Sequence, residues 1–324
     1  MTWSRSRRSA VIVAAAAVVG LGALTYARYR PSLERARARI STGSRIAATR
    51  CGPIEYAERG EGPPVLVVHG AGGGFDQGLE LGEGLARVGF RVIAPSRFGY
   101  LRTPLPADAS AEAQADAHAC LLDALKVPRA AVTGVSAGGP SALQFALRFP
   151  DRTRALVLLV PAAYAPWTGQ APARASRATM FLFDTALRSD FLFWVGSHVA
   201  RRVFVRAILG TPPELLANAP PEEQGRLETV LAHILPVSPR RLGLLNDAKI
   251  VSSLPRPDLE KITAPTLAIS TADDQYGTYP GARYTAEHVP NARFVGYPSG
   301  GHMLVGRGAD ATAEILAFVR RTAP

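Results

Sequence analysis

Short apolar runs separated by longer amphipathic stretches dominate the chain from residue 51 onward. Each run holds four to seven residues, is rich in Val, Ile, Leu and Ala, and lacks strict alternation with polar residues. This pattern predicts β-strands that are buried on both faces of a sheet. We expect these strands at 54–58, 65–68, 91–94, 130–133, 154–160, 266–270 and 292–297.

Helical periodicity fills the stretches between these runs. We expect helices at 79–88, 111–125, 140–149, 282–288 and 311–321. Ser110 and Asp310 precede two of them and are expected as N-caps. Strands that alternate with helices indicate βαβ units, and hence an α/β fold whose mainly parallel central sheet has helices on both faces.

The alternation breaks between about residues 161 and 257, where the sequence is helical, punctuated by prolines and contains several aromatic clusters. An insertion at the carboxyl edge of a parallel sheet lies over the place where such sheets bind ligands. We therefore expect a helical cap at 161–257, and a core formed by 41–160 together with 258–324.

Residues 1–40 form a separate basic and apolar segment. Residues 10–26 carry no charge, and about 20 apolar residues span a bilayer. Arg5, Arg7 and Arg8 before this run favour a cytoplasmic N-terminus, which would place the following domain outside the cytoplasm. We expect a membrane anchor through this N-terminal helix. A cleaved signal peptide, giving a secreted or periplasmic protein, is the alternative.

Two observations complicate this segment. Five arginines between residues 28 and 39 follow the apolar run at once, and they discourage export of that flank. A helix buried in the core is a third possibility, which we disfavour because no amphipathic pattern accompanies the run.

The net charge of +11 is concentrated at the N-terminus. Residues 1–50 hold ten arginines and one acidic residue, so the remainder of the chain is close to neutral. Nucleic acid is therefore not an expected partner. The two cysteines, Cys51 and Cys120, permit one disulfide but do not fix the redox compartment, and Cys120 in an expected helix is typical of a small buried hydrophobe.

The sequence Gly134-Val135-Ser136-Ala137-Gly138 lies between an expected strand and an expected helix. This Gly-x-Ser-x-Gly pattern in a strand–turn–helix context is typical of a nucleophile elbow, in which small neighbours tolerate a sharply turned serine. The motif alone could also be an ordinary glycine-rich loop. Ser136 is the candidate nucleophile.

A serine nucleophile needs a base, and the base needs an orienting carboxylate. His302 follows two glycines in the loop after the last strand, whereas four other histidines, at 118, 198, 233 and 288, are in positions typical of structural residues. Asp273 and Asp274 follow the strand expected at 266–270. Since adjacent side chains diverge, we expect one carboxylate to reach His302 and the other to be a solvated turn residue.

Acyl transfer also needs backbone N–H groups that stabilise an oxyanion. Ala137, directly after the candidate nucleophile, supplies the first of these donors. The second is expected from the glycine-rich loop 69–74, which lacks both dinucleotide and P-loop patterns. No His, Asp or Glu cluster has metal-ligand spacing, so neither a metal nor another cofactor is expected.

These ordered motifs strongly resemble those of the α/β-hydrolase superfamily over roughly residues 50–324. The resemblance implies an α/β-hydrolase fold and a serine hydrolase that cleaves an ester through an acyl-enzyme. It also implies that the fourth residue of 271–274, Asp274, is the acid, with Asp273 as the fallback. Ala71 is then the second oxyanion donor, and Gly72 is its fallback.

Two departures from related families leave the reaction open. Cap-bearing C–C bond hydrolases of ring-cleavage pathways usually have Asn before the nucleophile and Trp after the histidine, where this chain has Val135 and Met303. Residues 96–103 also depart from the usual Asp-x-Arg-Gly-x-Gly-x-Ser loop, which changes one wall of the site. A hydrolase-fold protein that binds a ligand without turnover is a further alternative. The aromatic cap favours a small ester with an apolar acyl group.

Overall fold

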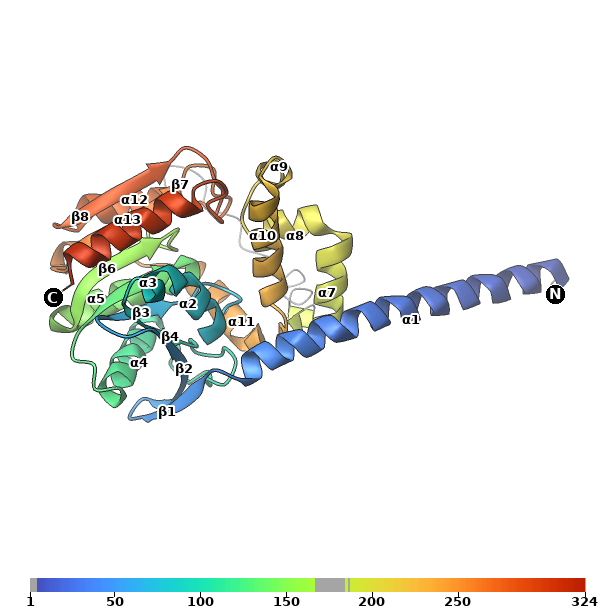
Figure 1. The fold of residues 1–324 in the computed structure, drawn as a ribbon, viewed down its shortest axis with the longest axis horizontal. Helices are drawn as coiled ribbons and strands as arrows, with labels where there is room; N and C mark the ends of the chain where they lie inside the picture. The colour runs from blue at the N-terminus through green and yellow to red at the C-terminus, as the bar shows by residue number, and fades with distance from the viewer. Residues whose placement is uncertain (1–4, 167–183, 186, 324) are drawn as a thin grey trace.

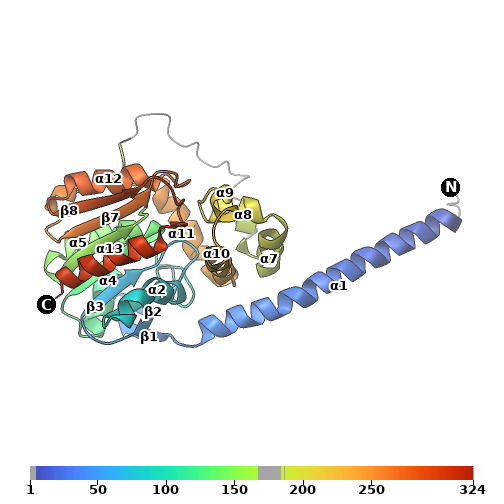
Figure 2. The same ribbon diagram turned by 45° about the horizontal axis from the view of Figure 1, so that its top comes forward.

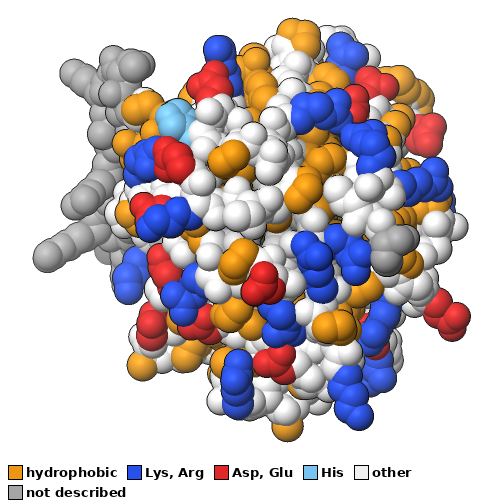
Figure 3. All heavy atoms as spheres, turned by 90° about the vertical axis from the view of Figure 1, so that its left-hand side faces the viewer, with side chains coloured by type: hydrophobic (Ala, Val, Ile, Leu, Met, Phe, Trp, Pro, Cys, Tyr) orange, Lys and Arg blue, Asp and Glu red, His pale blue; other side chains and the backbone are white. Residues whose placement is uncertain are grey.

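The computed structural model describes residues 5–166, 184–185 and 187–323. Its α/β body carries one long helix, α1 (Arg5–Ser41), which projects away from the body with the N-terminus at its far end (Figures 1 and 2). On the face shown in Figure 3, basic and acidic side chains are interspersed. The charge of the body is thus mixed on this face.

One eight-stranded sheet forms the centre of the body, in the order β1-β2-β4-β3-β5-β6-β7-β8. Strands β3 to β8 run parallel, whereas β2 is antiparallel to both β1 and β4. The strands are β1 (Arg45–Thr49), β2 (Gly52–Arg59), β3 (Pro64–Val68), β4 (Arg91–Pro95), β5 (Ala130–Val135), β6 (Thr153–Leu159), β7 (Thr266–Thr271) and β8 (Ala292–Tyr297).

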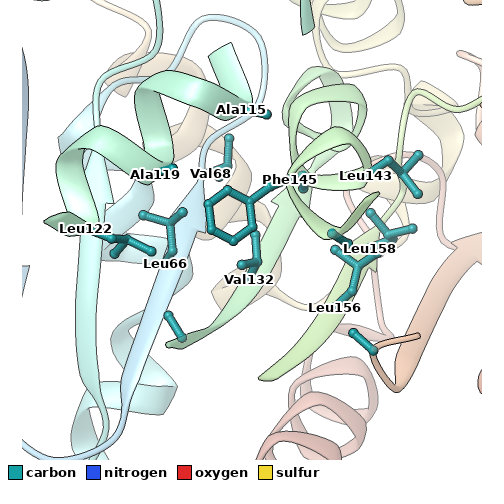
Figure 4. Close-up of a cluster of buried hydrophobic side chains, with 14 of the residues drawn as sticks. Leu66, Val68, Ala115, Ala119, Leu122, Val132, Leu143, Phe145, Leu156 and Leu158 are labelled. Carbon is teal, nitrogen blue, oxygen red and sulfur yellow. The ribbon is translucent and has the colours of Figure 1, made fainter. Parts of the chain in front are cut away.

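Helices cover both faces of the sheet, which explains why its strands are apolar without alternation. Leu66 and Val68 of β3 face the helices α4 (Ala111–Ala124), α5 (Gly139–Arg148) and α12 (Thr278–His288), in the core shown in Figure 4. Val65 and Val67 point to the other face, covered by α2 (Phe75–Leu81), α3 (Glu83–Arg87) and α13 (Gly308–Arg321). The expected mainly parallel α/β architecture is confirmed.

The chain between β6 and β7 contributes helices to the side of the body toward which the parallel strands point (Figure 1). In the part that the structure describes, these helices are α7 (Asp190–Val199), α8 (Arg201–Ile208), α9 (Pro213–Ala217), α10 (Pro221–His233) and α11 (Arg241–Val251). We refer to residues 187–251 as the cap helices. They have a hydrophobic cluster of their own, separate from the two that line the sheet.

The second half of α1 packs against the cap helices. Tyr29 and Ala36 are buried in the same cluster as Phe193 and Trp194, whereas the described residues from Ile12 to Leu24 are exposed. The apolar run itself is thus not buried in the core, whereas its continuation is partly buried against the cap. The first half of α1 is therefore apolar and exposed, whereas its second half packs on the body.

Several local expectations differ from the structure. Strand β1 was not expected, because an exposed edge strand carries no apolar run. The helix expected at 79–88 is two helices, α2 and α3, separated at Gly82. Ser110 is an N-cap and accepts a hydrogen bond from the Ala113 amide, but α13 begins before Asp310, which lies in its first turn.

Cys120 is not a free buried hydrophobe, because it forms a disulfide with Cys51. The bond joins the turn between β1 and β2 to α4 across a sequence separation of 69 residues. It therefore ties the edge of the sheet to a helix that covers it.

Candidate active site

Ser136 lies at a sharp turn between β5 and α5. It opens a short 3₁₀ helix, η1 (Ser136–Gly138), with a left-handed φ of 50° that non-glycine residues rarely adopt. A Cβ at Gly134 would lie 2.5 Å from the Ala142 Cβ, and one at Gly138 would lie 2.6 Å from backbone oxygens of β3 and the loop after it. Only glycine allows this close packing, which holds the serine out of the strand.

Ser136, His302 and Asp274 form a continuous hydrogen-bonded chain. The His302 Nε2 lies 2.9 Å from the Ser136 Oγ, and its Nδ1 lies 2.7 Å from the Asp274 Oδ2. Because a carboxylate only accepts, Nδ1 carries the proton and Nε2 is free to accept the serine proton. His302 and Asp274 are buried, while Ser136 remains half-buried. This is the geometry that a serine nucleophile and its base require.

The two adjacent carboxylates point to different partners. Asp274 also accepts hydrogen bonds from the Tyr276 amide and the Thr278 hydroxyl, which fix its orientation toward His302. Asp273 accepts from the amides of Gly301, at 2.8 Å, and Gly300, at 3.3 Å. The second carboxylate is therefore not a solvated turn residue, since it holds the loop that presents His302.

The cap helices contact both of these loops through the connection between α8 and α9. The Gly210 carbonyl accepts hydrogen bonds from the amides of His302 and Gln275, and the Thr211 hydroxyl accepts from the Met303 amide. A Cβ at Gly210 would lie 3.0 Å from the His302 Cβ. The backbone of the cap thus packs directly on the histidine loop.

The glycine-rich loop 69–74 lies against the serine from the other side. A Cβ at Gly70 would lie 3.2 Å from the Ser136 Cβ. The Gly72 amide donates to the Tyr100 hydroxyl at 3.3 Å, whereas within the described chain the amide of the exposed residue Ala71 has no protein acceptor. The Ala137 amide is in the first turn of a helix, so it has no acceptor from that helix. Of the two loop amides, Ala71 is the one available to a ligand.

The direction of the Ala71 amide follows from contacts of the preceding carbonyl. The Gly70 oxygen accepts from the Arg97 Nη2 at 3.1 Å and from the His69 Nδ1 at 2.7 Å. In a planar trans peptide the C=O and the next N–H point in opposite directions. Two buried donors on the Gly70 oxygen therefore turn the Ala71 N–H away from them.

Arg97 and Tyr100 belong to the altered loop 96–103, and both bind the cap residue Asp247. The Arg97 guanidinium makes two hydrogen bonds to this carboxylate, at 2.6 and 2.7 Å, and the Tyr100 hydroxyl donates to it at 2.5 Å. All three side chains are buried. Burial and the nearby Arg97 charge also lower the pKa of His69 well below its usual value, so His69 is neutral.

A second buried ion pair holds the other end of the glycine-rich loop. Arg240, which precedes α11 and is fully buried, donates to the Gly73 carbonyl at 2.5 Å and to both oxygens of Asp76. Burial disfavours the charged form of Asp76, but Arg240 and Arg39 of α1 outweigh it and lower the pKa to about 2. Two arginine–aspartate pairs between core and cap thus hold the loop at Gly70 and at Gly73.

The cap aromatics that led us to expect an apolar acyl pocket have other partners. Phe193 packs against Phe204, and Phe191 packs against Tyr29 of α1. Phe181 and Phe183 lie outside the described residues. An apolar cap side chain beside the glycine-rich loop is instead Ile234, whose Cγ2 would lie 3.5 Å from a Cβ at Gly72.

Sequence reasoning missed Arg97, Tyr100, Asp247, Asp76 and Arg240 as parts of the site. The altered loop 96–103 was the one available signal. The described residues contain no group of three or more His, Cys, Asp or Glu side chains that could hold a metal ion.

Comparison with known proteins agrees with this architecture. A family model described as the alpha/beta hydrolase fold matches residues 63–308. The chain belongs to the α/β-hydrolase family. A solved α/β-hydrolase fold protein from Nakamurella multipartita has a TM-score of 0.67 and 26% identity, covering 86% of this chain and 99% of that one.

Curated relatives carry hydrolase names. The chain is 26% identical over 275 residues to the uncharacterised hydrolase YcgS of Bacillus subtilis, covering 82% of this chain and 94% of that protein. It is also 40% identical to a 2-hydroxymuconate semialdehyde hydrolase from Pseudomonas putida, over 106 residues that cover 32% of this chain and 37% of the relative. The names support a hydrolase and leave the bond that it cleaves undecided.

Proposed function

We propose that this α/β-hydrolase is a serine hydrolase that cleaves carboxylic esters. The observation that carries the proposal is the hydrogen-bonded chain from Asp274 through His302 to a strained, half-buried Ser136. In the first step the Ser136 oxygen attacks the acyl carbon while its proton passes to the His302 Nε2. The Asp274 carboxylate stabilises the resulting imidazolium.

The oxyanion formed in this step accepts hydrogen bonds from the Ala71 and Ala137 amides. His302 then returns the proton to the leaving alcohol, and the C–O bond breaks to give an acyl-enzyme. Water attacks this intermediate with His302 again as base, which releases the acid and restores Ser136. The proposal requires neither a metal nor another cofactor.

Reaction with a fluorophosphonate probe and turnover of p-nitrophenyl esters test this proposal. We expect the wild type to be labelled and Ser136→Ala to be unlabelled, with turnover in Ser136→Ala lower by about 10⁴-fold or more. Activity should be undiminished in EDTA. Absence of labelling would favour a non-catalytic ligand-binding protein, and loss of activity in EDTA would contradict the mechanism.

Cleavage of a C–C bond is the second candidate, because the Pseudomonas putida relative is named for a ring-cleavage product. The same nucleophile and base could serve this reaction, but Val135 and Met303 stand where such enzymes usually have Asn and Trp. Comparing kcat/KM for 2-hydroxymuconate semialdehyde with that for p-nitrophenyl butyrate separates the two. A higher kcat/KM for the semialdehyde would contradict the esterase proposal in favour of C–C bond cleavage.

For the substrate we propose a small ester with an apolar acyl group. Ile234 beside the glycine-rich loop supports an apolar wall. Each buried methylene contributes about 0.8 kcal/mol, so kcat/KM should rise by up to about fourfold per methylene from acetyl to medium-chain esters. A flat series, or a preference for charged acyl groups, would overturn this assignment.

For location we propose a membrane anchor with the hydrolase domain outside the cytoplasm. The helix from Ile12 to Ser41 is long and apolar enough to cross a membrane, although a signal sequence has the same properties. The Cys51–Cys120 disulfide supports an oxidising compartment. Full-length protein in the soluble fraction would contradict the anchor, and a mature form starting near Arg28 would indicate secretion instead.

A further inference from the structure

The end of the apolar half of α1 lies beside the first turn of α7. Tyr26 ends the apolar run, and its ring centroid lies 6.2 Å from that of Phe191 in α7. One turn further on, the Tyr29 ring packs against both Phe191, at 5.2 Å, and Trp194, at 5.8 Å. These aromatic contacts fix α7 beside the point at which α1 changes from apolar to charged.

The axis of α7 runs across the axis of α1 (Figure 1). If α1 crosses a bilayer, α7 therefore lies along its surface, and α8 follows α7 directly in the chain. Tyrosine and tryptophan are enriched at the membrane–water interface because their side chains are amphipathic. Residues Ile12 to Leu24 of α1 are exposed, so they are available to lipid.

These two cap helices expose large apolar side chains that do not pack into the body. Val199 is 82% exposed, Val203 is 62% exposed and Leu192 is 54% exposed. Leu192 and Val199 are seven residues apart, so they lie on one side of α7. By contrast, Phe193, Trp194 and Val205 on the same two helices are buried in the cap cluster. The three exposed side chains thus lie outside the cap cluster.

Basic side chains flank this apolar surface. Arg201, Arg202 and Arg206 of α8 are all exposed, and Arg28 of α1 is exposed near the same level. Arg201 and Arg202 also pair with Glu228 and Glu214, so they do not form a purely cationic patch. Apolar side chains beside arginines are typical of helices that lie in the interface of a membrane with anionic lipids.

We propose that α7 and α8 dock on the bilayer that α1 crosses, with Leu192, Val199 and Val203 inserted among the lipid headgroups. The cap would then rest on the membrane. This interaction surface depends on the proposed anchor and not on the proposed chemistry. Where the esterase proposal also holds, the cap lies next to amphiphilic esters in the bilayer, which defines the class of substrate that the enzyme would meet.

Lipid quenching of a fluorophore on full-length protein in nanodiscs tests the surface. Val199→Cys and Val203→Cys are labelled with an NBD group and compared with Val88→Cys, an exposed valine of the core, and with Val18→Cys in the apolar half of α1. The nanodiscs contain phosphatidylcholine and phosphatidylglycerol with spin labels either near the headgroup or in mid-chain. We expect headgroup labels to quench positions 199 and 203, and mid-chain labels to quench position 18, at least twice as strongly as they quench position 88.

Each other outcome overturns the proposal. Quenching at position 18 without quenching at 199 and 203 would leave the anchor and remove the docking surface. No quenching at any position would remove both. Protection of the 199 and 203 labels without lipid quenching, together with a dimeric mass, would assign the surface to a second copy.

A kinetic experiment separates this surface from the chemistry. Val199→Glu/Val203→Glu should lower hydrolysis of a long-chain ester presented in vesicles by about tenfold, while kcat/KM for soluble p-nitrophenyl butyrate is unchanged. Val88→Glu should leave both rates unchanged. An equal loss on both substrates in the double variant would contradict docking, and inactivity of the wild type on every ester would contradict the esterase proposal while leaving the quenching result valid.

Discussion

At the scale of single residues, the two adjacent carboxylates of the site have different hydrogen-bond partners. Asp274 contacts His302, whereas Asp273 contacts the backbone of the loop that carries His302. We expect Asp274→Asn to lower kcat by about 10⁴-fold, because an amide can favour the wrong histidine tautomer. Asp273→Asn should cost only about tenfold, because an amide oxygen can still accept from the Gly301 amide.

Steady-state kinetics on a p-nitrophenyl ester checks this order, and circular dichroism shows whether both variants are folded. If Asp273→Asn proved the more damaging of the two in folded protein, the assignment of Asp274 as the acid would be wrong. The proposed serine–histidine pair would survive that result.

His118 provides a pH-dependent contribution to stability. Burial, reinforced by Arg97, lowers its pKa to about 3, compared with about 6.5 in an unfolded chain. Between these values the unfolded state binds the additional proton, so stability is lost as the pH falls through this window. From pH 7 to pH 5 the loss from this residue is about 2 kcal/mol.

Thermal unfolding of His118→Gln at pH 7 and pH 5 measures this contribution. Glutamine can still bond the Ser141 hydroxyl, which the His118 Nε2 approaches at 3.4 Å, but it does not titrate. We expect the difference in Tm between the two pH values to be smaller in the variant than in the wild type. Equal differences would show that His118 is not the group responsible.

The residues expected to react could be predicted because their signals are local. Ser136 is marked by glycines on both sides, and His302 by two preceding glycines. The partners of the carboxylates could not be predicted in this way. Asp273 contacts amides 27 and 28 residues away, and Arg97 contacts a carboxylate 150 residues away. The first contact depends on how two loops of the core meet, and the second on how the cap folds back on the core.

At the scale of elements, the glycine-rich loop and the cap helices form one unit. Tyr100 accepts from the Gly72 amide and donates to Asp247 of α11, so it links the loop to the cap. We expect Tyr100→Phe to free the Gly72 amide, loosen the loop and lower kcat by about tenfold with little change in KM. Loss of a whole oxyanion donor would cost about 10² to 10³.

Comparing an ester with its thionoester distinguishes an effect on the oxyanion from general damage. Sulfur is a weak hydrogen-bond acceptor, so a displaced Ala71 amide should cost the oxygen ester more than the thionoester. The kcat/KM of the oxygen ester divided by that of the thionoester should therefore fall in Tyr100→Phe. The same ratio should remain unchanged in Tyr56→Phe, which removes the hydroxyl of another buried tyrosine. A constant ratio in both variants would show that Tyr100 is structural only.

Strands and helices could be predicted where burial requires a pattern of apolar residues in the sequence. They could not be predicted where the element is exposed. The buried strands β3 to β7 follow apolar runs, while the exposed edge strand β1 has none. The second half of α1 was missed because its buried residues, Tyr29 and Ala36, are separated by exposed arginines. Its packing surface is supplied by the cap, which lies far away in sequence.

At the scale of the whole molecule, the presence of the disulfide in cells depends on the compartment in which the hydrolase domain lies. Cys51 lies in a turn at the sheet edge and Cys120 in α4, and the bond between them closes a loop with a sequence separation of 69 residues. A loop of this size stabilises a folded domain by about 4 kcal/mol, chiefly by restricting the unfolded chain. Such a bond persists outside the cytoplasm and is rare within it.

We therefore expect protein taken directly from cells to contain no free thiol. Alkylation under denaturing conditions should add no mass before reduction and two groups afterwards, and a reducing agent should lower the Tm by about 5–10 °C. Cys51→Ser/Cys120→Ala should have the Tm of the reduced wild type and be insensitive to reductant. Two free thiols in protein alkylated during lysis would place the hydrolase domain in the cytoplasm, in accord with the arginines that follow the apolar run.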